Sequence, residues 1–291
     1  MARFTYLDLV DQVDGFPSPA SHPIQHAERL SGLHLFTAGT HTLGYVLPAV
    51  VAALHEAGPC WKITPTTVSL AGESVEERTR NMATTLAAWR DNGTFRVVAA
   101  GSWRNELYSV YSPNGELYLR LERSGAALFG VVTYGVSCCS YYNPWTSADR
   151  RQVHMTAFVP ATAAAPLRLW TPRRNVSKAT YGGMLDNTVA GGIASGTGAF
   201  ETLVKEAAEE ASLPEALVRE QARAVGVLSY FYVRDARAGG ETGLLQPEIE
   251  YVYELKLGED VIPAPCDDEV QDFHLMPVEE VSVYTPLVSI C

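Results

Sequence analysis

The stretch that sets the fold of this chain reads AGGIASGTGAFETLVKEAAEEASL and occupies residues 190–213. A glycine-rich turn leads into a segment with helical spacing that carries Glu206, Glu209 and Glu210. At about 100° per residue, these three carboxylates fall within an arc of roughly 100°. The other side of the helix carries Phe200, Val204, Ala207 and Ala211. The pattern predicts a helix with one face that docks and one face that presents carboxylates.

Three neighbouring carboxylates on one helix face repel each other. The repulsion is about 1 kcal/mol per pair at 4 Å in water, and it grows where solvent is excluded. A divalent cation removes this cost, and oxygen ligands favour Mg²⁺ or Mn²⁺ over zinc. We therefore predict a metal site at Glu206, Glu209 and Glu210. The alternative is a solvent-exposed acidic face, which an arbitrary E-x-x-E-E pattern would suggest first.

The spacing favours the metal site because the segment resembles the Nudix box. That pattern is a glycine, five residues, Glu, seven residues, and then Arg-Glu-apolar-x-Glu-Glu-x-Gly-apolar. The positions in register are Gly191, Glu206, Ala207, Glu209, Glu210 and Leu213. Three positions depart from the pattern: Thr197 replaces Glu, Lys205 replaces Arg, and Ser212 replaces Gly.

The flanking segments are similar to one Nudix branch, the thiamine-pyrophosphokinase-related group of two-domain proteins. The similar runs are MLDNTVAGGIASG, EEASLPEAL, YFYV, LLQPEIEYVYEL and DDEVQDFHL. The resemblance implies an α/β fold, a Nudix α/β/α sandwich with a mixed sheet, preceded by a small α/β accessory domain. Residues 137–151 have little periodicity, so we place the boundary there and predict an accessory domain over 1–145 and a Nudix domain over 146–291.

The resemblance also implies an activity, the metal-dependent hydrolysis of a diphosphate linkage in a small molecule. The substrate would be a thiamine diphosphate derivative or a nucleoside diphosphate linked to another group. The resemblance assigns Glu206, Glu209 and Glu210 as catalytic metal ligands and adds Ala190 to the ligand set. The acidic run at 267–269 matches the place where many Nudix enzymes carry a late glutamate, which makes Glu269 the preferred general base.

Three cations precede the carboxylate helix, and we expect them to bind the substrate. Arg173, Arg174 and Lys178 lie in a predicted loop after a strand at 167–170. In the resembling branch this loop contacts the diphosphate, and guanidinium groups suit bidentate phosphate recognition. The alternative is that these cations form salt bridges on an acidic protein. Glu248 and Glu250 could add carboxylates to the metal, but strand-surface charges are the preferred interpretation.

Two other classes of function stay open. Thr197 lacks the charge of Glu, and Lys205 cannot form the bidentate hydrogen bonds of Arg with a carboxylate. The fold could therefore instead serve an isomerase or cyclase acting on a small organic molecule. A non-catalytic ligand sensor would follow from an incomplete metal site. A wide, polar pocket beside Glu206 would favour a diphosphate, whereas a narrow, apolar one would favour the isomerase or cyclase.

Composition limits the partners of the protein. The formal net charge of −11 over 291 residues argues against a nucleic-acid-binding surface. There is no run of 18 apolar residues and no signal-peptide pattern at the start, so we predict no membrane association and a cytoplasmic location. We expect a small-molecule substrate, and the sequence does not set the oligomeric state.

Periodicity predicts the elements of both domains. In the accessory domain we expect helices at 5–13, 47–56 and 74–90, the last with a capping box from Ser74 to Glu77. Strands are expected at 33–36, 42–46, 95–99, 107–111 and 117–120, then at 153–159, 225–233 and 249–257 in the Nudix domain, followed by a helix at 278–283. The accessory domain shows no reaction chemistry of its own, and we expect it to shape the substrate pocket.

Overall fold

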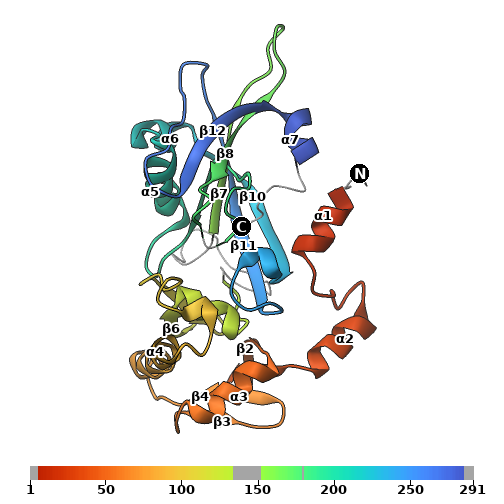
Figure 1. The fold of residues 1–291 in the computed structure, drawn as a ribbon, viewed down its shortest axis with the longest axis vertical. Helices are drawn as coiled ribbons and strands as arrows, with labels where there is room; N and C mark the ends of the chain where they lie inside the picture. The colour runs from red at the N-terminus through yellow and green to blue at the C-terminus, as the bar shows by residue number, and fades with distance from the viewer. Residues whose placement is uncertain (1–5, 134–151, 179, 285–291) are drawn as a thin grey trace.

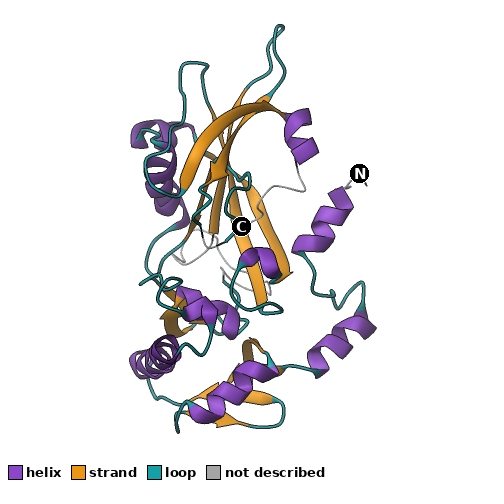
Figure 2. Ribbon diagram, viewed as in Figure 1, coloured by secondary structure: helices purple, strands orange, loops and turns teal. Residues whose placement is uncertain are grey.

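The computed structural model describes residues 6–133, 152–178 and 180–284, which form two α/β parts (Figure 1). Each part combines helices with a β-sheet (Figure 2). We call residues 23–133 the amino-terminal part and residues 152–284 the carboxy-terminal part. The predicted boundary between residues 145 and 146 lies outside the described residues.

The amino-terminal part contains a four-stranded sheet and a separate hairpin. The sheet has the order β2-β1-β4-β3, and β5 pairs with β6. Its elements are α2 (Pro23–Ser31), β1 (His34–Ala38), β2 (His41–Val46), α3 (Pro48–Glu56), β3 (Trp61–Ile63), β4 (Thr67–Leu70), α4 (Val75–Asn92), η1 (Arg96–Val98), β5 (Leu107–Tyr111), β6 (Leu117–Glu122) and η2 (Arg123–Leu128). The rings of Trp61 and Trp89 both stack on Phe129 in the core.

Most of the predicted elements are present in this part, but α2, β3 and β4 were not expected. The strand expected at 95–99 is wrong, because Arg96–Val98 forms a 3-10 turn that buries Val97 and Val98 without a strand partner. The predicted cap of α4 is confirmed in one direction: Ser74 Oγ accepts the Glu77 amide at 3.1 Å. The Glu77 carboxylate accepts from the amide of Glu73 at 2.8 Å, one residue before the expected donor.

The carboxy-terminal part is built on a mixed sheet of order β10-β11-β7-β8-β12, with β9 paired to β7. The pairing of β11 with β7 is parallel and the others are antiparallel. The elements are β7 (Gln152–Val159), β8 (Arg168–Arg174), β9 (Val189–Gly192), α5 (Ala199–Ala211), α6 (Glu215–Gln221), β10 (Arg223–Val233), η3 (Ala236–Ala238), β11 (Leu245–Lys256), β12 (Val270–Pro277) and α7 (Val278–Tyr284).

Helix α5 packs on this sheet through the face predicted to dock. Leu203, Ala207 and Ala211 are fully buried with Val153 and Met155 of β7 in one core cluster. Because side chains alternate along a strand, the odd-numbered residues of β7 face this core. The packing of α5 on the sheet fixes the position of its carboxylates relative to β9.

Two expectations for this part need correction. Arg173 and Arg174 do not lie in a loop, because β8 extends to Arg174 and pairs with β12. Strand β12 was not expected, since its sequence VQDFHLMP mixes polar and apolar residues on both faces. Its formation places the two arginines on a rigid strand, where successive side chains point to opposite faces.

Helix α1 (Tyr6–Val13) lies beside β10 of the carboxy-terminal part, away from the amino-terminal sheet (Figure 1). The Phe231 amide donates to Asp14 Oδ1 at 2.8 Å, and the Phe16 amide donates to Phe231 O at 3.2 Å. The rings of Phe16 and Phe231 stack with centroids 4.3 Å apart. The Phe16 ring also stacks with Tyr45 of β2, so Phe16 contacts both parts. In the described part of the chain, no helix combines the length and apolar character needed to cross a membrane.

Candidate active site

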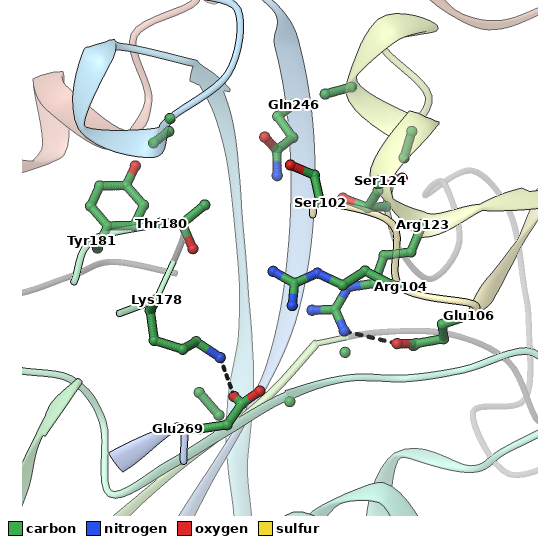
Figure 3. A pocket seen from close by; sticks show the side chains of 18 of the residues that line it. Ser102, Arg104, Glu106, Arg123, Ser124, Lys178, Thr180, Tyr181, Gln246 and Glu269 are labelled. Carbon is green, nitrogen blue, oxygen red and sulfur yellow. Dashed lines mark hydrogen bonds and ion pairs between the residues drawn. The ribbon is translucent and has the colours of Figure 1, made fainter. Parts of the chain in front are cut away.

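A cavity of about 480 Å³ lies where the two parts meet. The amino-terminal part contributes side chains from the segment before β5 and from η2, including Arg104, Glu106 and Arg123. The carboxy-terminal part contributes β9, the exposed face of α5, and the residues around Lys178 and Glu269. Figure 3 shows the labelled side chains of both parts pointing toward one another across this space. Most of the lining is polar or charged.

The three carboxylates predicted on α5 all line this cavity, but they differ in burial. The side chain of Glu209 is 51% exposed and that of Glu206 is 18% exposed, whereas Glu210 is 8% exposed as a residue. Burial raises the pKa of Glu206 and raises the pKa of Glu210 well above its ordinary value. The charge of Glu209 also raises the pKa of Glu206, and the charge of Glu206 raises the pKa of Glu210, so these carboxylates favour a nearby cation.

Strand β9 packs directly against these carboxylates. The Ala190 amide donates to Glu210 Oε2 at 3.1 Å. A Cβ atom at Gly191 would lie 2.4 Å from Glu206 Cγ, a distance that real Cβ atoms do not show, so any larger residue here would displace the Glu206 side chain. The predicted ligand Ala190 therefore lies beside Glu206 and Glu210, with its amide already bound to a carboxylate.

Lys205 lies between the exposed ends of two of the glutamates. Its Nζ is 2.7 Å from Glu209 Oε2 and 3.5 Å from Glu206 Oε1. In this arrangement the described residues contain no group of three or more His, Cys, Asp or Glu side chains gathered closely enough to hold a metal ion. The donor chemistry of Glu206 and Glu210 still fits a hard divalent cation, because Glu210 is buried, Glu206 is half-buried, and both carboxylates have raised pKa values and face one cavity. The long Lys205 side chain is 59% exposed and has room to turn away.

The three cations predicted to bind substrate differ in position and in their partners. Arg174 lines the cavity, but its Nη1 is 2.6 Å from Asp186 Oδ2 in a largely buried ion pair. Lys178 lines the cavity and pairs with Glu269 (Figure 3). Arg173 does not line it, because its position on β8 turns it to the other side, where Nη1 donates to Gly183 O at 3.0 Å.

Glu269 reaches the same cavity from the segment before β12. Burial alone would raise its pKa, but the hydrogen bond and charge of Lys178, with Arg174 and Arg104, hold that pKa below its ordinary value. Glu269 is therefore ionised and able to accept a proton once its pairing with Lys178 loosens.

Glu248 and Glu250 are not strand-surface charges, and that preferred interpretation was wrong. They are only 4% and 3% exposed, on β11, which lies between β10 and β7 in the sheet. Tyr230 donates to Glu250, whose Oε1 lies 3.1 Å from His154 Nε2. Glu248 lines the cavity and accepts from Gln246 at 2.8 Å. Burial raises the pKa of Glu248.

The amino-terminal side of the cavity was missed by motif reasoning. Arg123 donates to Glu106 Oε2 at 2.9 Å and lies over the Tyr108 ring at 5.5 Å. A Cβ atom at Gly192 would lie 2.2 Å from Tyr108 Oη, so β9 is in close contact with this wall. No spacing pattern marks these residues. The only signal was the expectation that the accessory domain shapes the pocket.

Comparison with known proteins agrees with this geometry. A family model described as a NUDIX domain matches residues 153–289, and one described as a domain of unknown function (DUF4743) matches residues 16–133. Residues 153–289 form a Nudix domain. The predicted fold class, a Nudix α/β domain with a mixed sheet behind a smaller α/β part, is confirmed.

Two curated relatives are longer than this chain. The uncharacterized Saccharomyces cerevisiae protein YJR142W is 29% identical over 288 residues, which are 95% of this chain and 78% of that protein. Nudix hydrolase 20, chloroplastic, of Arabidopsis thaliana is 33% identical over 217 residues, or 74% of this chain and 50% of that protein. The chain thus spans about half the length of the Arabidopsis relative. The NUDIX domain and the similarity to the Arabidopsis Nudix hydrolase support an enzyme of the hydrolase class.

Among solved structures, DR0079 from Deinococcus radiodurans is 19% identical, with a TM-score of 0.38. The match covers 60% of this chain and 86% of that one.

One departure from the Nudix box has a visible structural consequence. Ser212 ends α5 in the left-handed conformation with φ 53°, and its amide donates to Ala207 O. Glycine adopts this conformation without steric cost, which explains why the pattern has Gly at this position. Serine here places local strain at the end of the Nudix helix.

Proposed function

We propose that this protein hydrolyses a diphosphate linkage in a small molecule, in a reaction that depends on Mg²⁺ or Mn²⁺. The observation that carries the proposal is the meeting, in one polar interdomain cavity, of buried α5 carboxylates with the cations Arg174 and Lys178. Carboxylates suit the metal and cations suit the phosphate oxygens, so both halves of a metal-diphosphate complex have ligands here.

Glu206, Glu209 and Glu210 are the side chains that would hold the metal. Glu210 is buried and Glu206 is half-buried, both facing the cavity, and Glu209 becomes available when Lys205 turns away. Ala190 can add only its carbonyl oxygen, because its amide donates to Glu210. When bound, the ion neutralises diphosphate charge and activates water for attack.

Glu269 is the proposed general base. It faces the same cavity as the α5 carboxylates, and its pKa is held below the ordinary value chiefly by Lys178, against the effect of burial. If the diphosphate draws Lys178 to itself, Glu269 loses its partner and its pKa rises toward that of a useful base. Substrate binding would thereby activate the base.

The substrate class follows from the cavity. It is wide and polar, as a diphosphate requires, and this favours hydrolysis over the isomerase or cyclase alternative. Resemblance of the segments flanking the box to the thiamine-pyrophosphokinase-related branch supports a thiamine diphosphate derivative, with a nucleoside diphosphate linked to another group as the second choice. A cytoplasmic location and the absence of nucleic-acid partners stay predictions based on sequence composition.

The test is a hydrolysis assay of the whole chain with Mg²⁺ or Mn²⁺ against thiamine diphosphate, nucleotide sugars, dinucleotides and prenyl diphosphates. We expect cleavage of at least one class, a loss of about a hundredfold in kcat for Glu210→Gln, and little change for Glu201→Gln. Glu201 is a matched control because it lies on the same helix but pairs with Arg219 at the surface. An intact panel would overturn the proposal, and the isomerase or cyclase alternative would then lead.

A further inference from the structure

The phosphate-binding cations of the Nudix domain are already engaged. Arg174 pairs with Asp186, and Lys178 pairs with Glu269. Lys205 bonds to Glu209. A cation that is neutralised by a nearby carboxylate attracts a phosphate less strongly than a cation without such a partner. A cation elsewhere in the cavity wall that has no carboxylate partner would therefore add to the binding of the diphosphate.

The other arginines of the wall are also bound, with one exception. Arg123 pairs with Glu106, and Arg234 donates to Gln246 Oε1 and to the carbonyls of Ala238 and Gly239. Within the described ranges, Arg104 is the cavity-lining cation whose side chain makes no hydrogen bond or ion pair. Its guanidinium points into the cavity toward the side where Lys178 and Glu269 lie (Figure 3).

The backbone around Arg104 is held in place independently of its side chain. The Arg104 amide donates to Glu122 Oε1 at 2.9 Å. The neighbouring Trp103 donates to Asn105 Oδ1 at 3.1 Å and lies under the guanidinium of Arg90 at 4.6 Å. Asn105 takes the left-handed conformation with φ 56°, which asparagine tolerates better than most residues. These contacts hold the backbone of the loop without the Arg104 side chain, which is therefore available to bind a ligand.

We propose that Arg104 is a substrate-binding residue whose guanidinium binds phosphoryl oxygens of the diphosphate, so that the amino-terminal part completes the active site of the Nudix domain. This inference rests on the proposed diphosphate substrate. A planar guanidinium can donate two parallel hydrogen bonds to a phosphoryl group, and this arrangement orients the group as well as holding it. The substrate then bridges the two parts of the chain.

The test measures binding separately from hydrolysis. Calorimetry with imidodiphosphate, whose P–N–P link resists cleavage, is performed on the whole chain with and without Mg²⁺. Arg104→Ala should weaken binding by about tenfold or more, since charge-assisted hydrogen bonds are lost. Arg104→Lys should bind more tightly than Arg104→Ala but less tightly than wild type, because lysine keeps the charge but cannot donate two parallel hydrogen bonds from a planar group. Arg80→Ala removes one positive charge from the exposed surface of α4, outside the cavity, and should bind like wild type.

The outcomes separate this inference from the proposed hydrolysis. Equal affinity in Arg104→Ala and Arg80→Ala overturns the role of Arg104, even if the wild type cleaves a diphosphate. A wild type that fails to bind imidodiphosphate overturns it as well. If binding depends on Arg104 but the protein cleaves nothing in the panel, the role of Arg104 is supported and only the proposed hydrolytic activity is overturned. Should Arg104→Ala fold poorly, Arg104→Gln keeps the length of the side chain and gives the same comparison.

Discussion

Gly191 and Glu206 are in direct contact, and a Cβ atom at position 191 would lie 2.4 Å from Glu206 Cγ and 2.6 Å from its Cδ. Gly191→Ala should therefore displace the Glu206 carboxylate and lower Mg²⁺ or Mn²⁺ affinity by about tenfold, equivalent to 1.4 kcal/mol. Calorimetric titration of the metal measures this. Gly198→Ala is the control, because a Cβ there meets nothing within 4 Å. Unchanged metal affinity in Gly191→Ala would show that Glu206 is not a ligand.

Ser212 gives a prediction for stability. It holds φ 53° at the end of α5, in the region where glycine has no steric cost. Ser212→Gly should raise the free energy of unfolding by about 1 kcal/mol, as measured by urea denaturation. The reverse comparison is available at Gly93, which ends α4 with φ 66°, and Gly93→Ser should lower stability by a similar amount. A neutral result at both positions would contradict the strain argument.

Glu210 should make stability depend on pH. Burial raises its pKa well above the ordinary value of 4.5, with the charges of Glu206, Asp186 and Glu269 adding to the rise. Between the unfolded and folded pKa values the folded state holds more protons, so the free energy of unfolding falls as pH rises through that window. Without metal, Glu210→Gln should be more stable than wild type above the window and equal to it below the ordinary value.

Urea denaturation of both proteins across pH, with and without Mg²⁺, measures this difference. A saturating metal ion should reduce the advantage of the Glu210→Gln variant, because the ion binds the ionised carboxylate of the folded wild type. A difference that does not depend on pH would mean that packing, and not charge, sets the effect.

The Arg174–Asp186 pair should contribute strongly to folding. The two charges are 2.6 Å apart, with side chains 15% and 6% exposed. Arg174→Ala leaves the Asp186 carboxylate buried without its cation, and the free energy of unfolding should fall by about 3 kcal/mol. Adding Asp186→Asn should recover a large part of this loss, and a double-mutant cycle in urea measures the coupling. If the two losses are additive, the pair is not a unit.

Thr197 and Lys205 test whether hydrolysis is weakened by the departures from the Nudix box. Lys205 bridges Glu209 and Glu206 as a point charge, whereas arginine could hold a neighbouring carboxylate through two bonds. Thr197→Glu with Lys205→Arg should raise kcat/KM for the diphosphate about tenfold, or roughly 1.4 kcal/mol of barrier. Thr197→Glu alone should give no gain, because it adds a negative charge without a partner. A double variant no faster than wild type would argue against this reading.

The sequence alone determined the features that depend on local spacing. The 3.6-residue period places Glu206, Glu209 and Glu210 on one face of α5, and the box spacing brings Gly191 and Ala190 to that face. The same reasoning found most helices and strands, because their apolar periods are regular. It also found the cap at Ser74, whose partner is three residues away.

Tertiary structure decided how charges pair and which ones are buried. Helical periodicity cannot show that Glu210 is buried while Glu209 is half exposed, since this depends on the packing of β9 against α5. Arg174 and Asp186 meet because β8 and the segment after it fold onto each other, and Glu250 is buried between Tyr230 of β10 and His154 of β7. Arg104 enters the cavity from a segment far from the box in sequence, and only the docking of the two parts brings it there.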